Sequence, residues 1–185
     1  MNDGAEAVLT MAASSLLTGH WMWHHITRLG EAQILVPAMV ALLLILSLKV
    51  ATRPTAIRWV CCTTAAALIT VLSKIAFIGY GLGIESWDFT GFSGHSMFSA
   101  AILPGLIGLI WPGRNSRFQV WTLLPGTLLA LLIAVSRVQV GAHSWSEAAL
   151  GALLGLSVTV AVWIVPRQVH RPSLKMMWIS GAMAA

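Results

Sequence analysis

The chain has 185 residues, of which 57% are hydrophobic and only 9% are charged. Soluble domains carry about a quarter charged residues, so this composition excludes an ordinary soluble domain and favours a protein embedded in lipid. The formal net charge is +5, but long apolar stretches separate the charges, which argues against a basic nucleic-acid-binding surface. Cys61 and Cys62 are adjacent in an apolar stretch without zinc-site spacing, so we interpret them as core residues.

The N-terminal segment, residues 1–30, is predicted to lie at the membrane interface rather than to cross the bilayer. Residues 5–17 place apolar side chains on one helical stripe, but this stretch is too short to span the hydrocarbon layer. Trp21 and Trp23 follow at the position where an aromatic belt would contact the lipid headgroups. We therefore expect an N-terminal interfacial helix.

Five longer apolar stretches follow, and at about 1.5 Å per helical residue each can cross much of a hydrocarbon layer roughly 30 Å thick. They comprise residues 32–48, 59–81, 96–111, 118–135 and 148–165. The prediction is an all-α integral membrane protein, a bundle of five transmembrane helices plus the interfacial helix. Residues 31–166 would form the transmembrane core, and residues 167–185 a basic cytoplasmic tail. Gly151 and Gly155 in the last span favour close helix packing within the chain over a dimer contact.

The distribution of charge orients these spans. Eight of the eleven Lys and Arg residues fall on the side that carries the C-terminus, and all six Asp and Glu residues fall on the other side. The positive-inside rule therefore makes the C-terminal side cytoplasmic. We expect a multi-pass protein of the plasma membrane, the inner membrane in a bacterium, whose other side faces the periplasm or the exterior.

Five polar residues stand at the non-cytoplasmic ends of four spans. They are Lys74, His95, Arg137, His143 and Glu147. A charged side chain at the centre of a transmembrane helix costs about 2.5–3.5 kcal/mol on insertion scales, so such residues need a compensating role. Their common location predicts that the helix ends converge on one polar site.

Residues 91–96, Gly-Phe-Ser-Gly-His-Ser, open the third span. Ser93 is placed to cap the helix, and Gly94 lets a ligand approach the backbone closely. The N–H groups and the positive dipole of such a helix start attract an anion such as phosphate. The alternative without chemistry is a capped transmembrane helix in which His95 hydrogen-bonds to a neighbour.

Arg137, His143 and Glu147 form a second group. If residues 143–147 are helical, the i, i+4 spacing lets the Glu147 carboxylate hold one ring N–H of His143 and leaves the other ring nitrogen free to attack. Arg137 offers a forked donor for phosphate oxygens, and Lys74 offers a point charge. A buried ion pair between Arg137 and Glu147 would instead satisfy both charges without chemistry.

These residues resemble the three motifs of the type-two phosphatidic acid phosphatase family, which shares its core with the vanadium haloperoxidases. The family motifs are a lysine, six further residues and Arg-Pro; then Pro-Ser-Gly-His; then Ser-Arg, five residues, His, three residues and Asp. The corresponding positions are Lys74, Phe92-Ser93-Gly94-His95, and Ser136-Arg137 with His143 and Glu147. The resemblance covers residues 74–147.

The resemblance implies a phosphatase in which His143 is the nucleophile and takes the phosphoryl group as a phosphohistidine. Glu147 would support His143, and His95 would be the general acid that protonates the leaving oxygen. Water would then hydrolyse the phosphohistidine. The implied phosphate clamp consists of Lys74, Ser93, the Gly94 backbone and Arg137. This scheme requires no metal or other cofactor.

Three positions depart from the family pattern. Gly81 and Leu82 stand where the family has Arg-Pro, so one clamp charge is missing. Phe92 replaces the proline of the second motif, and Glu147 replaces the aspartate with one additional methylene. Arg28, on the same side of the membrane, is the candidate substitute for the missing charge.

A phosphate site at the membrane surface favours a lipid phosphate as substrate. By family analogy the candidates are undecaprenyl pyrophosphate, phosphatidylglycerophosphate, phosphatidic acid and the phosphate of lipid A, and an outward-facing site favours the first or the last. A lipid phosphotransferase that uses the same phosphohistidine is one alternative. A non-enzymatic small-molecule carrier, in which the polar cluster is a translocation site, is another. The expected surroundings are the lipid bilayer, with no nucleic-acid partner.

Two further groups have a simpler interpretation. His20, His24 and His25 have a spacing that suits a metal on a helix face, but no acidic or cysteine ligand lies nearby, which favours interfacial histidines. Glu85 and Asp88 lie in the loop of residues 82–94, where they either steer an anionic headgroup or form a solvated loop.

Overall fold

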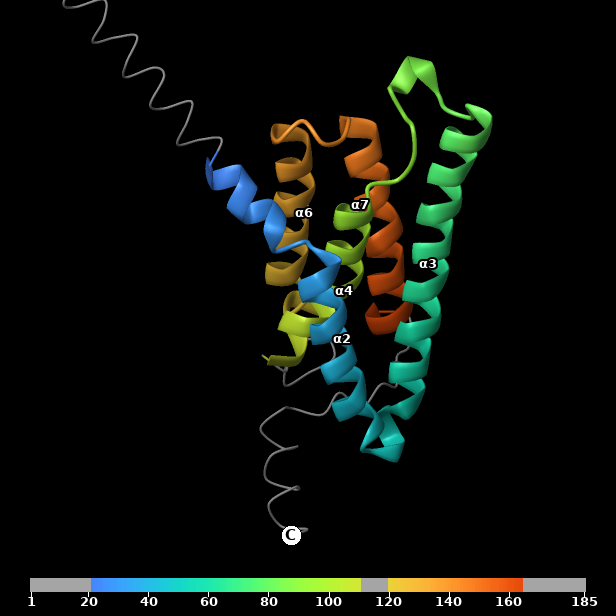
Figure 1. The fold of residues 1–185 in the computed structure, drawn as a ribbon. Coiled ribbons are helices and arrows are strands. Elements are labelled where there is room, and N and C mark those ends of the chain that lie inside the picture. The colour runs from blue at the N-terminus through green and yellow to red at the C-terminus, as the bar shows by residue number, and fades with distance from the viewer. Residues whose placement is uncertain (1–20, 111–119, 165–185) are drawn as a thin grey trace, which may run out of the picture.

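The structure, a computed structural model, describes residues 21–110 and 120–164 (Figure 1). Within these ranges the chain is helical, apart from short turns and an isolated bridge between Ile84 and Phe89. The main helices are α2 (Ala32–Ser47), α3 (Arg53–Tyr80), α4 (Gly94–Ile110), α6 (Leu124–Gln139) and α7 (Trp145–Thr159), which a π-helical turn (Val160–Ile164) extends. The predicted all-α fold is confirmed. The predicted interfacial helix of residues 5–17 and the tail of residues 167–185 lie outside the described residues.

Three helical stretches are long and apolar enough to cross a membrane: Trp21–Ser47, Val50–Tyr80 and Trp145–Ile164. Large apolar side chains cover the outer surface of the bundle, and Ile78 on α3 is 82% exposed. Outward-facing apolar surface of this extent is typical of contact with lipid. Helices α4 and α6 are apolar but shorter, with 17 and 16 residues. The chain is therefore a membrane protein with three candidate spans, and the count of five stays a prediction.

Local sequence signals explain where the helices depart from the predicted spans. Helix α3 begins at Arg53 rather than at residue 59, because Pro54 occupies its first turn. Backbone N–H groups in the first turn have no partner within the helix, so proline, which lacks this group, loses no hydrogen bond there. It ends at Gly81, whose φ of 66° is a left-handed conformation that favours glycine. Helix α6 continues to Gln139 instead of ending at residue 135, so Arg137 lies within its last turn.

Helix α4 lies at the centre of the bundle and contacts α2, α3, α6 and α7 (Figure 1). Met97, Ala100, Ala101 and Ile102 of α4 are fully buried, and glycines let the neighbouring helices approach. A Cβ atom on Gly151 of α7 would lie 2.6 Å from the Ser93 carbonyl oxygen, and one on Gly155 would lie 2.7 Å from the Ala100 Cβ. Both contacts are within the chain, which confirms the predicted packing role of this pair. The starts of α4 and α7 and the ends of α3 and α6 therefore lie at one end of the bundle (Figure 1).

Residues 21–28 form a helical segment that bends away from α2 through a turn at residues 29 and 30 (Figure 1). A Cβ atom on Gly30 would lie 2.5 Å from Ile133 Cγ2 and 2.9 Å from Ser99 Oγ. Glycine at this position therefore allows the chain to pack directly on α6 and α4. Trp21 is exposed on this segment.

Gly155→Ala should destabilise the bundle, because the added methyl group would overlap the backbone of α4 at Met97 and Ala101. We expect a loss of about 1–3 kcal/mol in the free energy of unfolding, the usual effect of overpacking. Unfolding in detergent micelles measures this change. Gly79→Ala in α3 is the matched control, because nothing lies within 4 Å of its Cβ position, and it should be neutral or slightly stabilising. Equal stability of both variants would contradict the packing role.

Candidate active site

His143 and Glu147 are in hydrogen-bonding contact at this end of the bundle. The Nδ1 atom of His143 lies 2.6 Å from Oε2 of Glu147. The other carboxylate oxygen, Oε1, accepts hydrogen bonds from the Thr90 backbone N–H, at 2.9 Å, and from the Thr90 hydroxyl. Because Glu147 is buried and accepts at both oxygens, its carboxylate has a fixed orientation. Nδ1 of His143 is then the protonated nitrogen, and Nε2 carries the lone pair.

The start of α7 produces this pairing through a helix cap. Ser144 is the N-cap: its Oγ accepts from the Glu147 N–H at 3.3 Å, and its own N–H donates to Glu147 Oε2 at 3.4 Å. This reciprocal arrangement is a capping box. His143 thus precedes the helix rather than lying in its first turn, and the chain before the cap turns back to place the imidazole on the carboxylate.

The loop between α3 and α4 packs against α3 at Ser73 and Lys74. The N–H of Phe92 donates to Ser73 Oγ at 3.1 Å. A Cβ atom on Gly91, whose φ is 141°, would lie 3.0 Å from Lys74 Cγ. The loop therefore packs against the stem of Lys74, and the positive charge of Lys74 acts on His143.

The start of α4 adjoins the same pair. Ser93 is fully buried, and its backbone N–H donates to the Glu147 carbonyl oxygen at 3.1 Å. Its Oγ accepts from the Ser96 N–H at 3.5 Å, a long cap, and from the Ser96 hydroxyl at 3.1 Å. Arg137 and Glu31 lie close enough for their charges to act on His95. The alternative without chemistry requires a hydrogen bond between His95 and a neighbouring residue. In the part of the chain that the structure describes, His95 makes no such hydrogen bond.

Arg137, in the last turn of α6, donates from Nη1 to Thr27 Oγ1 at 3.0 Å. Its Nε atom is buried and has no hydrogen-bond partner among the described residues. The ion pair between Arg137 and Glu147, the alternative to a catalytic site, does not form within residues 21–110 and 120–164. Glu147 contacts His143 and Thr90 instead, so the guanidinium keeps donors for an anion.

Burial is the main influence on the protonation of His143, which lies in the loop between α6 and α7. Burial lowers the pKa of His143 below its ordinary value of 6.5; the Glu147 hydrogen bond opposes this shift, and the positive charges of Lys74 and Arg137 reinforce it. The imidazole is therefore neutral at neutral pH. A neutral imidazole that is oriented through Nδ1 has the free lone pair that nucleophilic attack needs.

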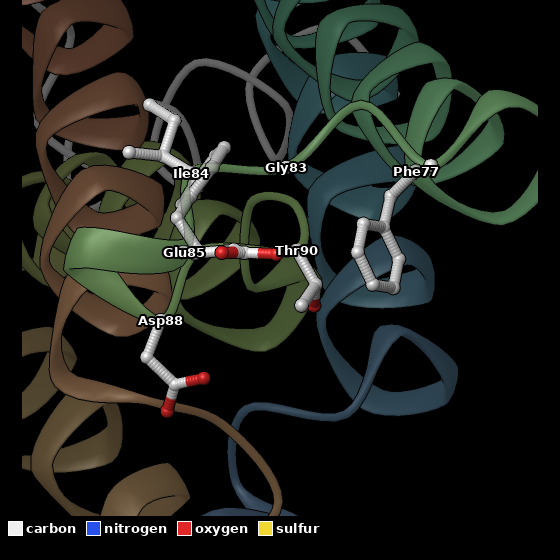
Figure 2. Close-up of a pocket in the computed structure, with 8 residues that line it drawn as sticks. Phe77, Gly83, Ile84, Glu85, Asp88 and Thr90 are labelled. Carbon is white, nitrogen blue, oxygen red and sulfur yellow. The ribbon is translucent and has the colours of Figure 1, made fainter.

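Two cavities open beside the pair. One, of about 310 Å³, is lined by His143, Ser144, Glu147, Thr90 and Asp88, together with residues 141–142. The other, of about 410 Å³, lies along the loop between α3 and α4, and Figure 2 shows Glu85, Asp88 and Thr90 in its lining. Asp88 and Thr90 line both, so the cavities are neighbours. Glu85 and Asp88 are exposed.

The five predicted polar residues are thus brought to one end of the bundle, and Ser93 and Gly94 lie beside them at the start of α4. Arg28 is exposed, whereas its neighbour Thr27 is buried and contacts Arg137. Its role as a substitute clamp residue stays a prediction. His24 and His25 are exposed, and His20 lies outside the described residues. Among the described residues, no group of three or more His, Cys, Asp or Glu could hold a metal ion.

Sequence reasoning did not identify Thr27, Glu31 and Thr90 as site residues. Thr27 lies in a helical segment, where most threonine hydroxyls bond to their own helix, and Thr90 lies in a loop, so neither threonine stands out in the sequence. Glu31 was visible as an acidic residue at the start of a span, but only the fold shows that its charge acts on His95 and Arg137.

Comparison with known protein families identifies one family. The sequence model of the PAP2 superfamily matches residues 77–171, a range that includes His95, Arg137, His143 and Glu147 and begins three residues after Lys74. The chain is 34% identical over 161 residues to an uncharacterized 22.5 kDa protein in the cps region of Klebsiella pneumoniae. That match covers 84% of this chain and 75% of the relative. No solved structure is significantly similar to the chain.

The His143 imidazole should titrate below pH 6.5, and Lys74→Met should raise its pKa by removing a neighbouring positive charge. Because the folded state disfavours the protonated imidazole, this group costs stability as the pH falls below 6.5 and costs none above it. Histidine NMR titration in detergent micelles, assigned with His143→Gln, measures the pKa. A His143 that titrates above 6.5 in the wild type would contradict this description of the site.

Proposed function

The chain belongs to the PAP2 superfamily, and we propose that it is a membrane lipid phosphatase that acts through a phosphohistidine at His143. Membership in this superfamily indicates a phosphatase-type activity, the hydrolysis of a phosphoric ester. The observation that supports a phosphohistidine at His143 is the 2.6 Å contact of His143 with the buried carboxylate of Glu147. That contact leaves Nε2 as the nucleophilic atom, in the field of Lys74 and Arg137.

The reaction proceeds in two displacements. In the first, the Nε2 lone pair of His143 attacks phosphorus, the bond from phosphorus to the leaving oxygen breaks, and His95 donates a proton to that oxygen. Glu147 stabilises the positive charge that develops on the imidazole. In the second, water attacks the phosphohistidine and gives a proton to His95, and the P–N bond breaks. Inorganic phosphate leaves, and both histidines return to their starting states.

The phosphate clamp uses positive charge and backbone donors at the helix ends. Lys74 and Arg137 stabilise the equatorial oxygens of the transferring phosphoryl group, whose charge develops most strongly in the transition state. Ser93 and the Gly94 backbone add the N-terminal end of α4, where N–H groups and the helix dipole favour an anion. Glu147 does not compete for Arg137, because both of its oxygens have other partners.

An apolar groove supports a lipid rather than a soluble substrate. The groove, of about 330 Å³, lies between α6 and α7 and begins at Trp145, two residues after His143. Its lining is almost entirely apolar and includes Leu131, Ala134, Ala149, Leu153 and Leu156. A hydrocarbon chain in this groove would extend along the outside of the bundle while its phosphate group reaches the polar end.

We propose that α4 and α6 also span the membrane, giving five spans with the site at the periplasmic or extracellular face and the C-terminus in the cytoplasm. Their 17 and 16 residues are near the lower limit for a span, and a locally thinner bilayer accommodates such helices. Undecaprenyl pyrophosphate and the phosphate of lipid A are the preferred substrates, with phosphatidylglycerophosphate and phosphatidic acid as the other candidates.

His143→Ala should abolish phosphate release, because the phosphoryl group then has no nitrogen to attack it. The assay uses purified protein in detergent with EDTA and a panel of lipid phosphates, and it compares wild type with the variant. His25→Ala is the control, since His25 is exposed outside the site, and it should retain full activity. Phosphate release that persists in His143→Ala excludes this nucleophile, and phosphate found on an added lipid acceptor identifies a phosphotransferase.

Ala149→Phe should raise KM for a long-chain lipid phosphate about tenfold, because a displaced chain segment of two methylenes is worth roughly 0.8 kcal/mol for each methylene. Turnover of a short-chain soluble phosphate should not change, since that substrate does not reach the groove. Ala65→Phe is the matched control, because Ala65 is exposed on α3, away from the groove. Equal effects on long and short substrates would contradict a chain-binding groove.

A further inference from the structure

Thr27 lies 110 positions before Arg137 in the sequence, yet its hydroxyl contacts the guanidinium of Arg137. Thr27 is 8% exposed, and its Oγ1 accepts from Arg137 Nη1 at 3.0 Å across 110 positions of sequence. The Arg137 Nε atom is buried and has no partner among the described residues. A guanidinium carries five N–H donors in one rigid plane, so a bond to one of them fixes the directions of the others.

The turn that follows Thr27 is packed against the same two helices. Gly30 lies directly on Ile133, one turn before Arg137, and on Ser99, one turn after His95. The next residue, Glu31, acts electrostatically on both Arg137 and His95. The segment of residues 27–31 is therefore held against the polar end of α4 and α6 by contacts that a larger residue at position 30 would prevent.

We propose that Thr27 is a positioning residue for Arg137, so that the segment preceding α2 is part of the active site. Thr27 holds the guanidinium plane through Nη1 and leaves the buried Nε–H directed at the phosphoryl oxygens. An unpaired buried donor is unfavourable, and a bound oxyanion would satisfy it. The inference rests on the proposed function because it assigns the phosphoryl group as the ligand of Arg137. Thr27 itself touches neither the substrate nor the reacting atoms.

The test compares Thr27→Val, which keeps the shape of the side chain and removes the hydroxyl, with Thr27→Ser, which keeps the hydroxyl. Thr27→Val should lower kcat/KM for a soluble aryl phosphate about 10- to 100-fold, the effect expected of a misplaced binding group, and should weaken inhibition by orthovanadate. Thr27→Ser should retain most of the wild-type kcat/KM and most of the inhibition by orthovanadate. The matched control is Thr159→Val, which removes the hydroxyl of another buried threonine, one that donates to the Ala100 carbonyl oxygen at 2.7 Å. Thr159→Val should change neither kcat/KM nor inhibition by orthovanadate.

A double-mutant cycle separates positioning from a general structural effect. If Thr27 acts through Arg137, Thr27→Val should have little further effect in an Arg137→Lys background. An equal loss in both backgrounds, or a Thr27→Val protein with wild-type kcat/KM and orthovanadate inhibition, overturns the inference. Comparing the orthovanadate-induced rise in unfolding temperature between wild type and Thr27→Val tests the positioning role of Thr27 without measuring turnover. Absence of phosphate release from the wild type counts against the proposed function, whereas an equal orthovanadate-induced rise in Thr27→Val and wild type counts against Thr27.

Discussion

The carboxylate of Glu147 and its backbone connect the start of α7 with the loop that precedes α4. The side chain bonds to His143 before α7 and to Thr90 in the loop that precedes α4, and the carbonyl oxygen accepts from the N–H of Ser93. Removing a carboxylate from water is costly unless hydrogen bonds replace its hydration. Because Glu147 is 5% exposed, these bonds are required for the fold as well as for orienting the histidine.

Close packing of α7 on α4 makes those bonds possible. Gly151 lies one turn after Glu147, and its missing side chain lets the backbone of α7 approach the carbonyl group of Ser93. Gly155, one turn further along, allows the same approach at Ala100. Small residues at such contacts are the usual means by which helices approach closely in lipid, where the hydrophobic effect does not drive them together. The position of the His143–Glu147 pair therefore depends on packing contacts between α7 and α4 that lie further along the bundle.

The sequence predicted the groups of the site better than it predicted their contacts. Lys74, His95 and Arg137 were recognisable because charged and ionisable residues are rare in an apolar chain, and alternating helix directions place their helix ends together. The contact of Thr27 with Arg137 was not predictable in this way. It depends on the bend at residues 29 and 30, which directs Thr27 inward and leaves Arg28 exposed. Hydrophobic periodicity gives the faces of a helix but not the direction in which the chain leaves it.

The additional methylene of Glu147, a departure from the aspartate of the family pattern, has a local explanation in the cap of α7. Position N3 of a capping box favours Glu, because its side chain reaches back to the backbone N–H of the N-cap residue, here Ser144. The same reach places Oε2 on Nδ1 of His143 and leaves Oε1 for Thr90. His143 directly precedes the cap residue Ser144. The carboxylate oxygen of Glu147 that accepts from the Ser144 N–H is therefore also the one that orients the imidazole. The longer carboxylate thus supports the histidine from within the helix start, and no separate residue is needed to close the cap.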